Sequence, residues 1–256
     1  MLGLGNSIIT GGTVTQSDFE PSDLGSTMLI WYKNDTGQTN LSGTDGTSAN
    51  RMQWADQSGG SRHAYQDTTD DKPGDGLIYE GGMDFELDTQ DHMNIAAGDG
   101  AIDFDHPKPF TIMVAMKRET HSAANQIIGS VNTEFLGFSA TDESVKLRAG
   151  GSATVITFAT SNLWSAGANF IITVTKDSSG NILCYKNSDF QAEDGGGTST
   201  LTGTALDLTI LGAQTTGDSG AKNFDGIIHE VIICDTVLST TNRNLAIDYL
   251  KTKFSI

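Results

Sequence analysis

The segment 223–239 constrains the fold of this chain more than any other, because it contains the most apolar run in the sequence. Alternate positions are apolar on both sides of an extended chain: Ile228, Ile232 and Cys234 on one side, and Ile227, Val231 and Ile233 on the other. A strand that is apolar on both faces belongs in the middle of a layered structure rather than at an edge. The sequence therefore predicts a buried strand with a layer of structure on each side.

A helix is predicted directly after this strand. Ser239 offers an N-cap oxygen, and cations in the last predicted turn, Lys251 and Lys253, favour the helix dipole. Apolar residues recur at helical spacing: Leu245, Ala246, Tyr249, Leu250 and Phe254. The two polar residues inside the apolar strand, His229 and Glu230, are expected to be structural groups at a strand end or sheet edge.

The upstream chain has the pattern of many short strands separated by turns. The predicted strands are 27–32, 51–54, 63–65, 77–79, 83–87, 110–116, 126–128, 134–138, 145–147, 153–158, 170–175, 181–185 and 206–211. In the strand 110–116, Phe110, Ile112, Val114 and Met116 share one face. Residues 35–50 are expected to form a long polar loop. Many strands and one helix predict an all-β sandwich or barrel.

Composition limits the partners of the chain. The 256 residues, with 30 glycines and 4 prolines, favour one large β domain. A net charge of −17 repels nucleic-acid phosphates and anionic membranes, so neither is an expected partner. Cys184 and Cys234 lie in apolar, strand-like runs and are expected to be buried free thiols, although a bridge between them stays open.

The first 25 residues are rich in Gly, Ser and Thr, which predicts an extended N-terminal arm (1–25) before a sandwich domain (26–256). Such an arm either frays or docks on a neighbour. It has neither the basic start nor the long apolar core of a secretory signal, so we expect synthesis in the cytoplasm without a signal peptide.

Several segments carry a pattern that resembles a known superfamily. Trp31-Tyr32 and the later Trp54-Ala-Asp-Gln-Ser-Gly59 are similar to its opening "W…W.D.SG", and 170–187 is similar to its long hairpin. The closing segment 224–254 is similar to "f.G.I.Eviiy...Ls..e...i..YL..KY". Together they resemble the concanavalin A-like lectin/glucanase superfamily, in its laminin-G-like form. The resemblance implies a jelly-roll β-sandwich of two antiparallel sheets with one C-terminal helix.

This resemblance also carries an expectation about function. Single domains of this kind are common in bacteriophage structural proteins, and Met1-Leu-Gly-Leu-Gly-Asn-Ser7 resembles the start of virion proteins of marine phages. The leading hypothesis is a non-catalytic virion protein, associated with capsid, tail or fibre, whose arm binds other virion proteins. The alternative is a carbohydrate-binding module or adhesin that recognises a host polysaccharide. A glycan hydrolase or lyase is the remote alternative, and a homo-oligomer is possible in each case.

No catalytic residue is assigned. The glucanase branch of the superfamily carries a Glu-x-Asp-x-x-Glu strand, and Glu86, Asp88 and Asp91 resemble it in part. Glu86 and Asp88 are two residues apart, which along a strand is a distance of about 6.6–6.8 Å. The two carboxyl groups of a retaining glycosidase lie only about 5–5.5 Å apart. Glu86 and Asp91 also have opposite parity. A solvated strand edge leading into a turn is the preferred interpretation.

Weak candidates remain for ligand and metal binding. Trp164 lies in a loop and is the tryptophan expected to be exposed, whereas Trp31 and Trp54 are expected to be buried. An acidic loop that contains Asp67, Asp70 and Asp71 could bind a ligand or Ca²⁺. Further along the chain, the pair Asp103 and Asp105 could also bind Ca²⁺. Calcium takes about six to eight oxygens, so solvated carboxylates are the preferred interpretation and no cofactor is assigned.

Overall fold

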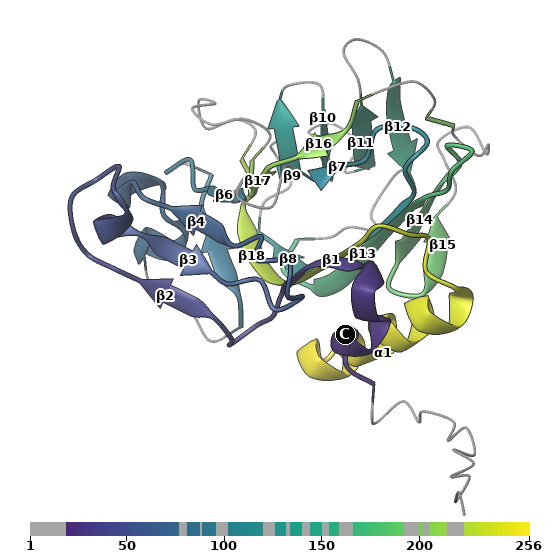
Figure 1. Cartoon of the computed structure of the whole chain (residues 1–256), viewed down its shortest axis with the longest axis horizontal. Coiled ribbons are helices and arrows are strands. Elements are labelled where there is room, and N and C mark those ends of the chain that lie inside the picture. The colour runs from purple at the N-terminus through teal and green to yellow at the C-terminus, as the bar shows by residue number, and fades with distance from the viewer. Residues whose placement is uncertain are drawn as a thin grey trace, which may run out of the picture.

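The structure is a computed structural model. It describes residues 19–76, 81–87, 89–95, 102–119, 126–131, 134–139, 144–149, 154–158, 166–191, 200–201, 205–213 and 223–256. Two antiparallel β-sheets pack face to face, and α1 (Thr240–Phe254) lies on the outer side of one of them (Figure 1). The predicted all-β sandwich with a single helix after the last strand is confirmed within the described residues. No described helix has the length and apolar character needed to cross a membrane.

Sheet I is the seven-stranded sheet that carries the helix. Its order is β1 (Met28–Tyr32), β18 (Gly226–Cys234), β8 (Phe110–Arg118), β13 (Asn169–Lys176), β14 (Ile182–Lys186) and β15 (Asp189–Gln191), with β5 (Met83–Phe85) also paired to β18. Both β1 and β5 pair with the same edge of β18, because β5 takes the first part of that strand and β1 the second. The predicted position of this strand in the middle of a sheet is therefore confirmed.

Sheet II has nine strands. Its order is β12 (Thr154–Phe158), β11 (Val145–Ala149), β10 (Glu134–Phe138), β9 (Gln126–Val131), β17 (Ile210–Leu211), β6 (Met93–Ile95), β4 (Ala64–Gln66), β3 (Met52–Trp54) and β2 (Gln38–Asn40). A separate pair joins β7 (Ile102–Asp103) to β16 (Asp207–Leu208). Short 3₁₀ turns complete the described part: η1 (Pro21–Thr27), η2 (Ser48–Asn50), η3 (Thr69–Asp71) and η4 (Pro73–Gly76).

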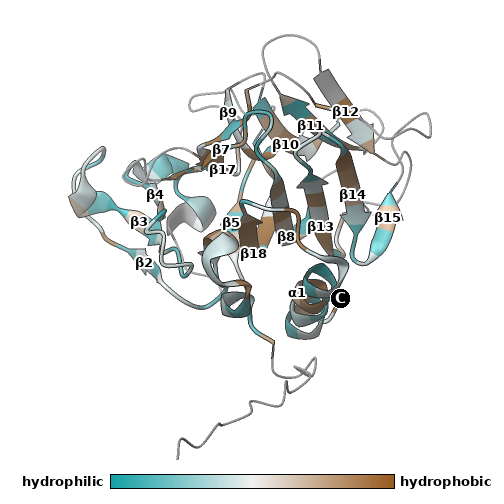
Figure 2. Ribbon diagram, turned by 45° about the vertical axis from the view of Figure 1, so that its right-hand side comes forward, coloured by the Kyte–Doolittle hydropathy of each residue, from teal (hydrophilic) through white to brown (hydrophobic). Residues whose placement is uncertain are grey.

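The main core lies between the two sheets. The predicted inward face of β8 is confirmed: Phe110, Ile112, Val114 and Met116 all belong to this core. Across the interface, the ring of Phe138 on β10 meets the ring of Phe170 on β13 edge to face at 6.2 Å between centroids. The ribbon coloured by hydropathy shows how strongly apolar β8, β13 and β18 are (Figure 2). Full burial of one large apolar side chain stabilises the fold by about 1.5–3 kcal/mol. The core between the sheets, which buries many of them, therefore supplies most of the stabilisation of the sandwich.

A second apolar layer joins sheet I to α1. Ala246, Ile247, Leu250 and Phe254 are buried against the outward side chains of β8, β13 and β18. The helix begins where the sequence predicts, since the Ser239 hydroxyl accepts a hydrogen bond from Asn242 N at 3.2 Å. The central strand is thus apolar on both faces because each face meets its own core.

One detail of the predicted strand is wrong. The alternation places Ile228 on the same face as Ile232 and Cys234, but the structure places it with Val231 and Ile233 in the core between the sheets. A β-bulge between Ile228 and Glu230 causes the change, because the extra residue, His229, reverses the parity of everything after it. The bulge lies where the partner on this edge changes from β5 to β1.

Glu230 lies in the middle of β18 and is completely buried, so the expectation of a strand end or sheet edge is also wrong. Its carboxylate faces the helix side of sheet I. It accepts hydrogen bonds from Trp31 Nε1 at 2.7 Å and Asn34 N at 3.3 Å. Lys253 Nζ on α1 lies 2.6 Å from Glu230 Oε2. One buried charge therefore links β18 to β1, to the turn after β1 and to the helix.

His229 is buried next to Glu230 in the chain, at the β-bulge itself. Its ring bonds the Gly81 carbonyl through Nδ1 and stacks on the Phe254 ring at 4.9 Å between centroids. Burial lowers the pKa of His229 below its usual value, and the imidazole is a structural group, as expected.

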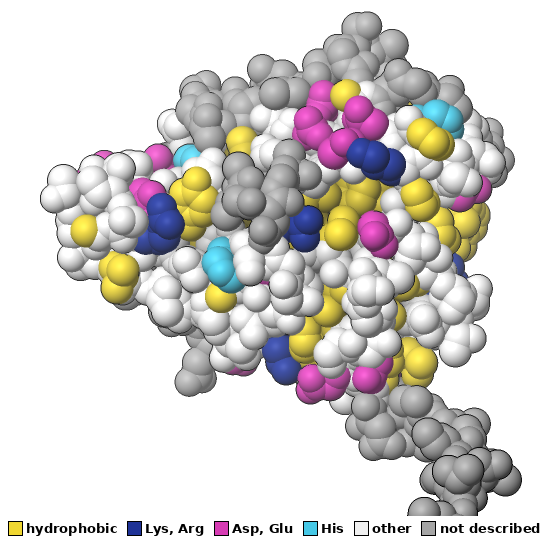
Figure 3. Space-filling view, viewed as in Figure 1, with side chains coloured by type: hydrophobic (Ala, Val, Ile, Leu, Met, Phe, Trp, Pro, Cys, Tyr) yellow, Lys and Arg dark blue, Asp and Glu magenta, His cyan; other side chains and the backbone are white. Residues whose placement is uncertain are grey.

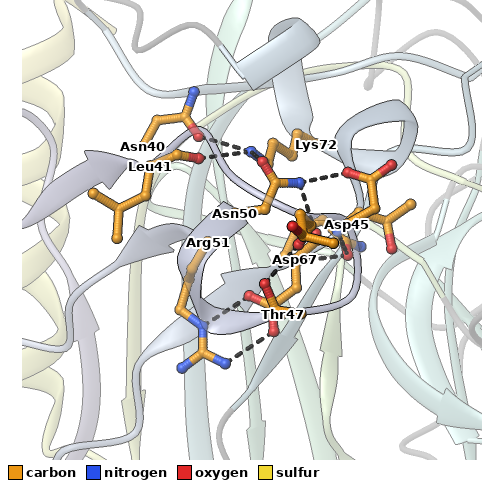
Figure 4. A network of polar contacts seen from close by, with 11 residues as sticks. Asn40, Leu41, Asp45, Thr47, Asn50, Arg51, Asp67 and Lys72 are labelled. Atoms are coloured by element: carbon orange, nitrogen blue, oxygen red, sulfur yellow. Dashed lines mark hydrogen bonds and ion pairs between the residues drawn. The ribbon is translucent and has the colours of Figure 1, made fainter.

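A lobe of loops and short strands, residues 38–72, extends from sheet II (Figure 1). Lys72 is buried at its centre, and its Nζ donates to three oxygens: Asn40 Oδ1 at 3.0 Å, Leu41 O at 3.1 Å and Asn50 Oδ1 at 3.1 Å (Figure 4). Asn50 in turn donates to Asp45 Oδ1 at 2.6 Å. The predicted polar loop 35–50 is corrected here, because it contains β2, a strand of three residues too short to show periodicity.

Three other expectations have mixed outcomes. Cys184 and Cys234 are buried free thiols, as expected. The predicted strand 206–211 is divided, because Asp207–Leu208 pairs with β7 whereas Ile210–Leu211 joins sheet II. Most of the predicted arm lies outside the described residues, although Phe19 and Leu24, near its predicted end, are buried against the helix layer.

The variant Lys253→Met is expected to lower the free energy of unfolding by about 3 kcal/mol, because removing one partner leaves the other charge buried and unpaired. Urea denaturation at neutral pH measures the change. Lys251→Met, in the same helical turn, is the matched control and should cost less than about 0.5 kcal/mol. Equal effects from the two variants would contradict the assigned role of Glu230.

Lys72→Met is expected to cost about 2–3 kcal/mol, because three oxygens, among them Oδ1 of the buried Asn50, lose their donor. The exposed Lys108, which pairs with Asp103, provides the comparison: Lys108→Met should lower the unfolding free energy much less than Lys72→Met does, because surface ion pairs contribute little. A larger loss for Lys108→Met than for Lys72→Met, measured by the same denaturation, would show that the lobe does not depend on its buried lysine.

Candidate functional site

Of the three carboxylates that resemble the glucanase pattern, Asp91 is committed to a turn. Asp91 is buried, and its oxygens are occupied: Oδ2 accepts from Gly74 N at 3.2 Å and Glu86 N at 3.1 Å, and Oδ1 accepts from the Thr89 hydroxyl at 2.7 Å. Asp91 therefore holds a turn and is not the solvated group that the sequence suggested. Asp88 lies outside the described residues.

Asp103 and Asp105 are brought together with Asp207, and their carboxylate oxygens lie within 4.8 Å of one another. Figure 3 shows acidic side chains gathered beside a basic one over β7 and β16. The basic group is Lys108, whose ammonium pairs with Asp103 and lowers the pKa of that carboxyl. Burial raises the pKa of Asp207. A lysine thus already supplies a positive charge at this predicted metal candidate.

The other predicted ligand candidates are separated from one another. Asp67 forms an ion pair with Arg51 at 2.8 Å, and its carbonyl accepts from Asn50 Nδ2 at 2.8 Å (Figure 4). Asp70 is exposed on η3, and the Asp71 carbonyl accepts from His92 N at 3.1 Å. Within the lobe, the side chain of Asp67 is thus held by an ion pair, whereas the contact of Asp71 is made through its backbone. Trp164 lies outside the described residues.

The predicted burial of the other two tryptophans is confirmed. Trp31 is 4% exposed and Trp54 is 0% exposed. Both indole N–H groups have acceptors, Glu230 for Trp31 and the Lys33 carbonyl at 2.9 Å for Trp54. Neither indole is available to bind a ligand at the surface.

A groove that the sequence did not predict lies on the outer face of sheet I, beside the start of α1. Its volume is about 450 Å³, and the side chains that line it are Thr175, Asp177, Asn181, Leu183 and Val237. Thr175 and Leu183 pair across β13 and β14. They face outward because their neighbours, Val174 and Cys184, point into the core between the sheets. Val237 comes from the segment between β18 and the helix.

The turn between β13 and β14 provides the polar end of the groove. Asp177 Oδ1 accepts from Ser179 N at 2.8 Å and Asn181 N at 2.9 Å, and Oδ2 accepts from Asn181 Nδ2 at 2.8 Å. These bonds, above all the one from the Asn181 side chain, lower the pKa of Asp177. Gly180 has φ +89°, and a Cβ there would lie 2.2 Å from Leu201 O, so the turn requires glycine. The carboxylate of Asp177 is therefore a fixed, ionised hydrogen-bond acceptor.

An aromatic patch continues from the groove along the same face. Phe190 on β15 is paired with Tyr185 on β14, and their rings meet at 5.8 Å between centroids. The guanidinium of Arg243, from the first turns of α1, lies 4.1 Å from the Tyr185 ring centroid. Leu183 is two residues before Tyr185, so both face outward. Phe190 is 55% exposed and Val237 is 38% exposed, so one exposed apolar side chain lines the groove and another lies beside it, against Tyr185.

The arrangement can bind a ligand that has both an apolar face and hydroxyl groups. Phe190 and Val237 offer exposed apolar contacts, Asp177 accepts hydrogen bonds and Arg243 donates them. The sequence predicted the hairpin strands and the turn at 177–180, but it missed β15 and its aromatic residue. The available signal was a single Phe in the otherwise polar run 187–191.

No protein-family model matches this chain, and no curated protein matches it in sequence. Solved structures do match in fold. A Trypanosoma rangeli sialidase is similar over 89% of this chain and 33% of its own, with a TM-score of 0.57 and 10% identity. The binding domain of Paraclostridial Mosquitocidal Protein 1 is similar over 89% of this chain and 52% of its own, with a TM-score of 0.57 and 10% identity.

The ligand-binding domain of botulinum neurotoxin serotype D, solved in complex with N-acetylneuraminic acid, is similar over 87% of this chain and 51% of its own. Its TM-score is 0.51 at 14% identity. This chain therefore spans between a third and about half of the length of these three proteins. At such identities the likeness shows the fold, an all-β sandwich of the kind that these carbohydrate-active and ligand-binding proteins contain.

Proposed function

We propose that this chain is a glycan-binding β-sandwich of the concanavalin A-like type, and that the groove beside α1 holds the sugar. The observation that carries the proposal is a groove lined by the polar groups of Asp177 and Asn181 and by the exposed Val237. Beside it, the exposed Phe190 and the guanidinium of Arg243 both lie against Tyr185. A pyranose presents C–H groups on one face and hydroxyls around its edge. It therefore suits an aromatic side chain beside fixed hydrogen-bonding groups.

The shape of the site also supports this proposal. Its volume of about 450 Å³ is within the range of about 300–1,000 Å³ of small-molecule sites. The polar end is held by backbone and side-chain bonds around Asp177, and the apolar end by two paired strands. A site fixed in this way loses little conformational entropy when a ligand binds.

The fold comparisons add a second, weaker support. A toxin domain of similar fold was solved with a sialic acid bound, and another is a binding domain. Fold alone does not determine function, so the proposal depends on the groove. We extend it to recognition of a host polysaccharide as a class, in keeping with the alternative drawn from the sequence.

The virion role expected from the sequence remains a prediction. It places the chain on a phage particle, with residues 1–25 bound to other virion proteins, and it is compatible with glycan binding by the same sandwich. Glycan cleavage has less support, because Asp91, the last acid of the Glu86, Asp88 and Asp91 pattern that suggested it, is buried and its oxygens accept hydrogen bonds within a turn.

Phe190→Ala is expected to weaken glycan binding at least tenfold, because the variant removes the exposed aromatic contact. A glycan array identifies a ligand for the wild-type chain, and calorimetry then compares the variants. Leu41→Ala is the matched control, since Leu41 is 54% exposed but lies in the lobe at residues 38–72. It should bind as tightly as the wild type.

Two results would contradict the proposal. One is a wild-type chain that binds no glycan on the array. The other is a ligand that Phe190→Ala and Asn181→Ala both bind with unchanged affinity, which would place the site elsewhere. Phe190 is exposed and at a sheet edge, so its removal should leave the sandwich folded, and circular dichroism checks this.

A further inference from the structure

Arg243, near the start of α1, is held by an aromatic ring and not by an acid. Its guanidinium lies 4.1 Å from the centroid of the Tyr185 ring. Within the part of the chain that the structure describes, no carboxylate forms an ion pair with it. Asp248, the one acidic residue of the helix, lies about 7.5 Å further along the helix axis and is turned by about 140°. The positive charge of Arg243 is therefore not neutralised by its own helix.

The contact with Tyr185 also determines which part of the guanidinium is presented to solvent. Arg243 Nε is buried and has no hydrogen-bond partner among the described residues, whereas the side chain as a whole is partly exposed. The two terminal nitrogens, which are not buried, form the outer end of the side chain. Their N–H groups form a planar fork that matches the two oxygens of a carboxylate. An anion can therefore be bound at the outer end while the inner end stays on the ring.

The same tyrosine holds the exposed aromatic side chain of the site. Phe190 meets Tyr185 edge to face at 5.8 Å between ring centroids, and more than half of Phe190 is exposed. Phe190 and Arg243 are thus placed around one ring, beside the groove. A sugar that lies with its C–H face on Phe190 directs the substituents of its ring sideways, because they project from the edge of the ring. A carboxylate carried by the sugar is such a substituent, and Arg243 is the cation within its reach.

The acidic groups of this region do not compete for the same place. Thr173 pairs with Tyr185, and Asp177 is four residues further, about 13 Å along the strand direction. The oxygens of Asp177 accept hydrogen bonds within their own turn. Asp189 pairs with Lys186 and faces the opposite side of the sheet from the exposed phenylalanine that follows it. Exposed charges more than about 8 Å apart are largely screened at physiological ionic strength, so the net charge of −17 acts weakly on an anion bound here.

We propose that this site selects sugars that carry a carboxylate, the uronic acid residues of an acidic polysaccharide, and that Arg243 recognises the carboxylate. The inference rests on the proposed glycan-binding function and adds the chemical class of the ligand. Phe190 takes the face of the sugar ring, and the fork of Arg243 takes the carboxylate at its edge. A hydrogen bond between ionised groups is roughly twice as strong as a neutral one. The site therefore prefers an acidic sugar to the neutral sugar of the same shape.

The test uses pairs of oligosaccharides that differ only in the carboxylate. Oligomers of galacturonic, glucuronic and mannuronic acid are each measured by calorimetry beside their carboxyl-reduced, neutral counterparts, at a salt concentration of about 0.15 M. The wild-type chain should bind at least one acidic oligomer about tenfold more tightly than its neutral counterpart. Arg243→Gln should bring this ratio close to one. Lys251→Gln removes the same charge from the same helix, about 12 Å further along its axis, and should keep the wild-type ratio.

A second variant separates the shape of the guanidinium from its charge. Arg243→Lys keeps the positive charge but loses the planar fork, so it should retain only part of the preference for acidic oligomers. Circular dichroism checks that both variants are folded. If Arg243→Gln fails to fold, Arg243→Lys decides the question, and an unchanged preference in that variant would contradict the role of the fork.

Two results would overturn the inference and leave the proposed function intact: equal binding of acidic and neutral oligomers by the wild type, or a preference for acidic oligomers that survives Arg243→Gln. Tighter binding of sulfated neutral oligomers than of uronic acids would show a site for anions in general, and would overturn the assignment to carboxylates. Binding of no oligosaccharide, acidic or neutral, would contradict the inference and the proposed function together.

Discussion

The buried charge of Glu230 is the constraint on which the arrangement of sheet I and its helix depends. An ionised carboxylate in the middle of an apolar layer is tolerated only with well-placed partners, and here they come from three separate segments: Trp31, Asn34 and Lys253. Apolar packing alone would let the helix slide or rotate, because it is not directional. The ion pair specifies one position, and the same helix carries Arg243 to the Tyr185 ring at its other end. The position of Arg243 against Tyr185, beside the groove, therefore depends on a contact far along the helix.

Much of the fold could be predicted from local patterns. The fold class and most of the strands follow from strand alternation and turn residues, and the helix follows from its cap and apolar spacing. Each of these signals is a property of a few consecutive residues. The bulge at His229 could not be predicted, since an extra residue leaves no mark in an alternation that is apolar on both faces. The strands β2, β16 and β17 contain two or three residues each, which is too few to show a period.

The candidate sites were less predictable, for a different reason. Asp103 and Asp105 were visible as a pair, but Asp207 joins them only through the pairing of β7 with β16. The carboxylates of Asp84, Glu86 and Glu119 come close together because β5, β18 and β8 pair in a particular register, and sequence gives no direct measure of register. The exposure of Phe190 depends on its position at the edge of a sheet. The acidic loop was a weak candidate for a ligand site, and the structure shows Asp67 held by an internal ion pair, which depends on the fold of the lobe.

The position of β18 has a consequence for how the chain acquires its structure. Cys234 pairs with Met28, and the same strand pairs with β8 on its other edge. A ribosome releases the chain from its N-terminus, so β1, β5 and β8 emerge long before the strand that joins them. Until then sheet I lacks its centre, and the edge of β8 that pairs with β18 has no partner. Contacts this distant in sequence make folding slow, because a long loop must close before they form. The sandwich therefore completes its fold only after nearly all of these residues have been synthesised, and the nascent chain needs protection from aggregation until that point.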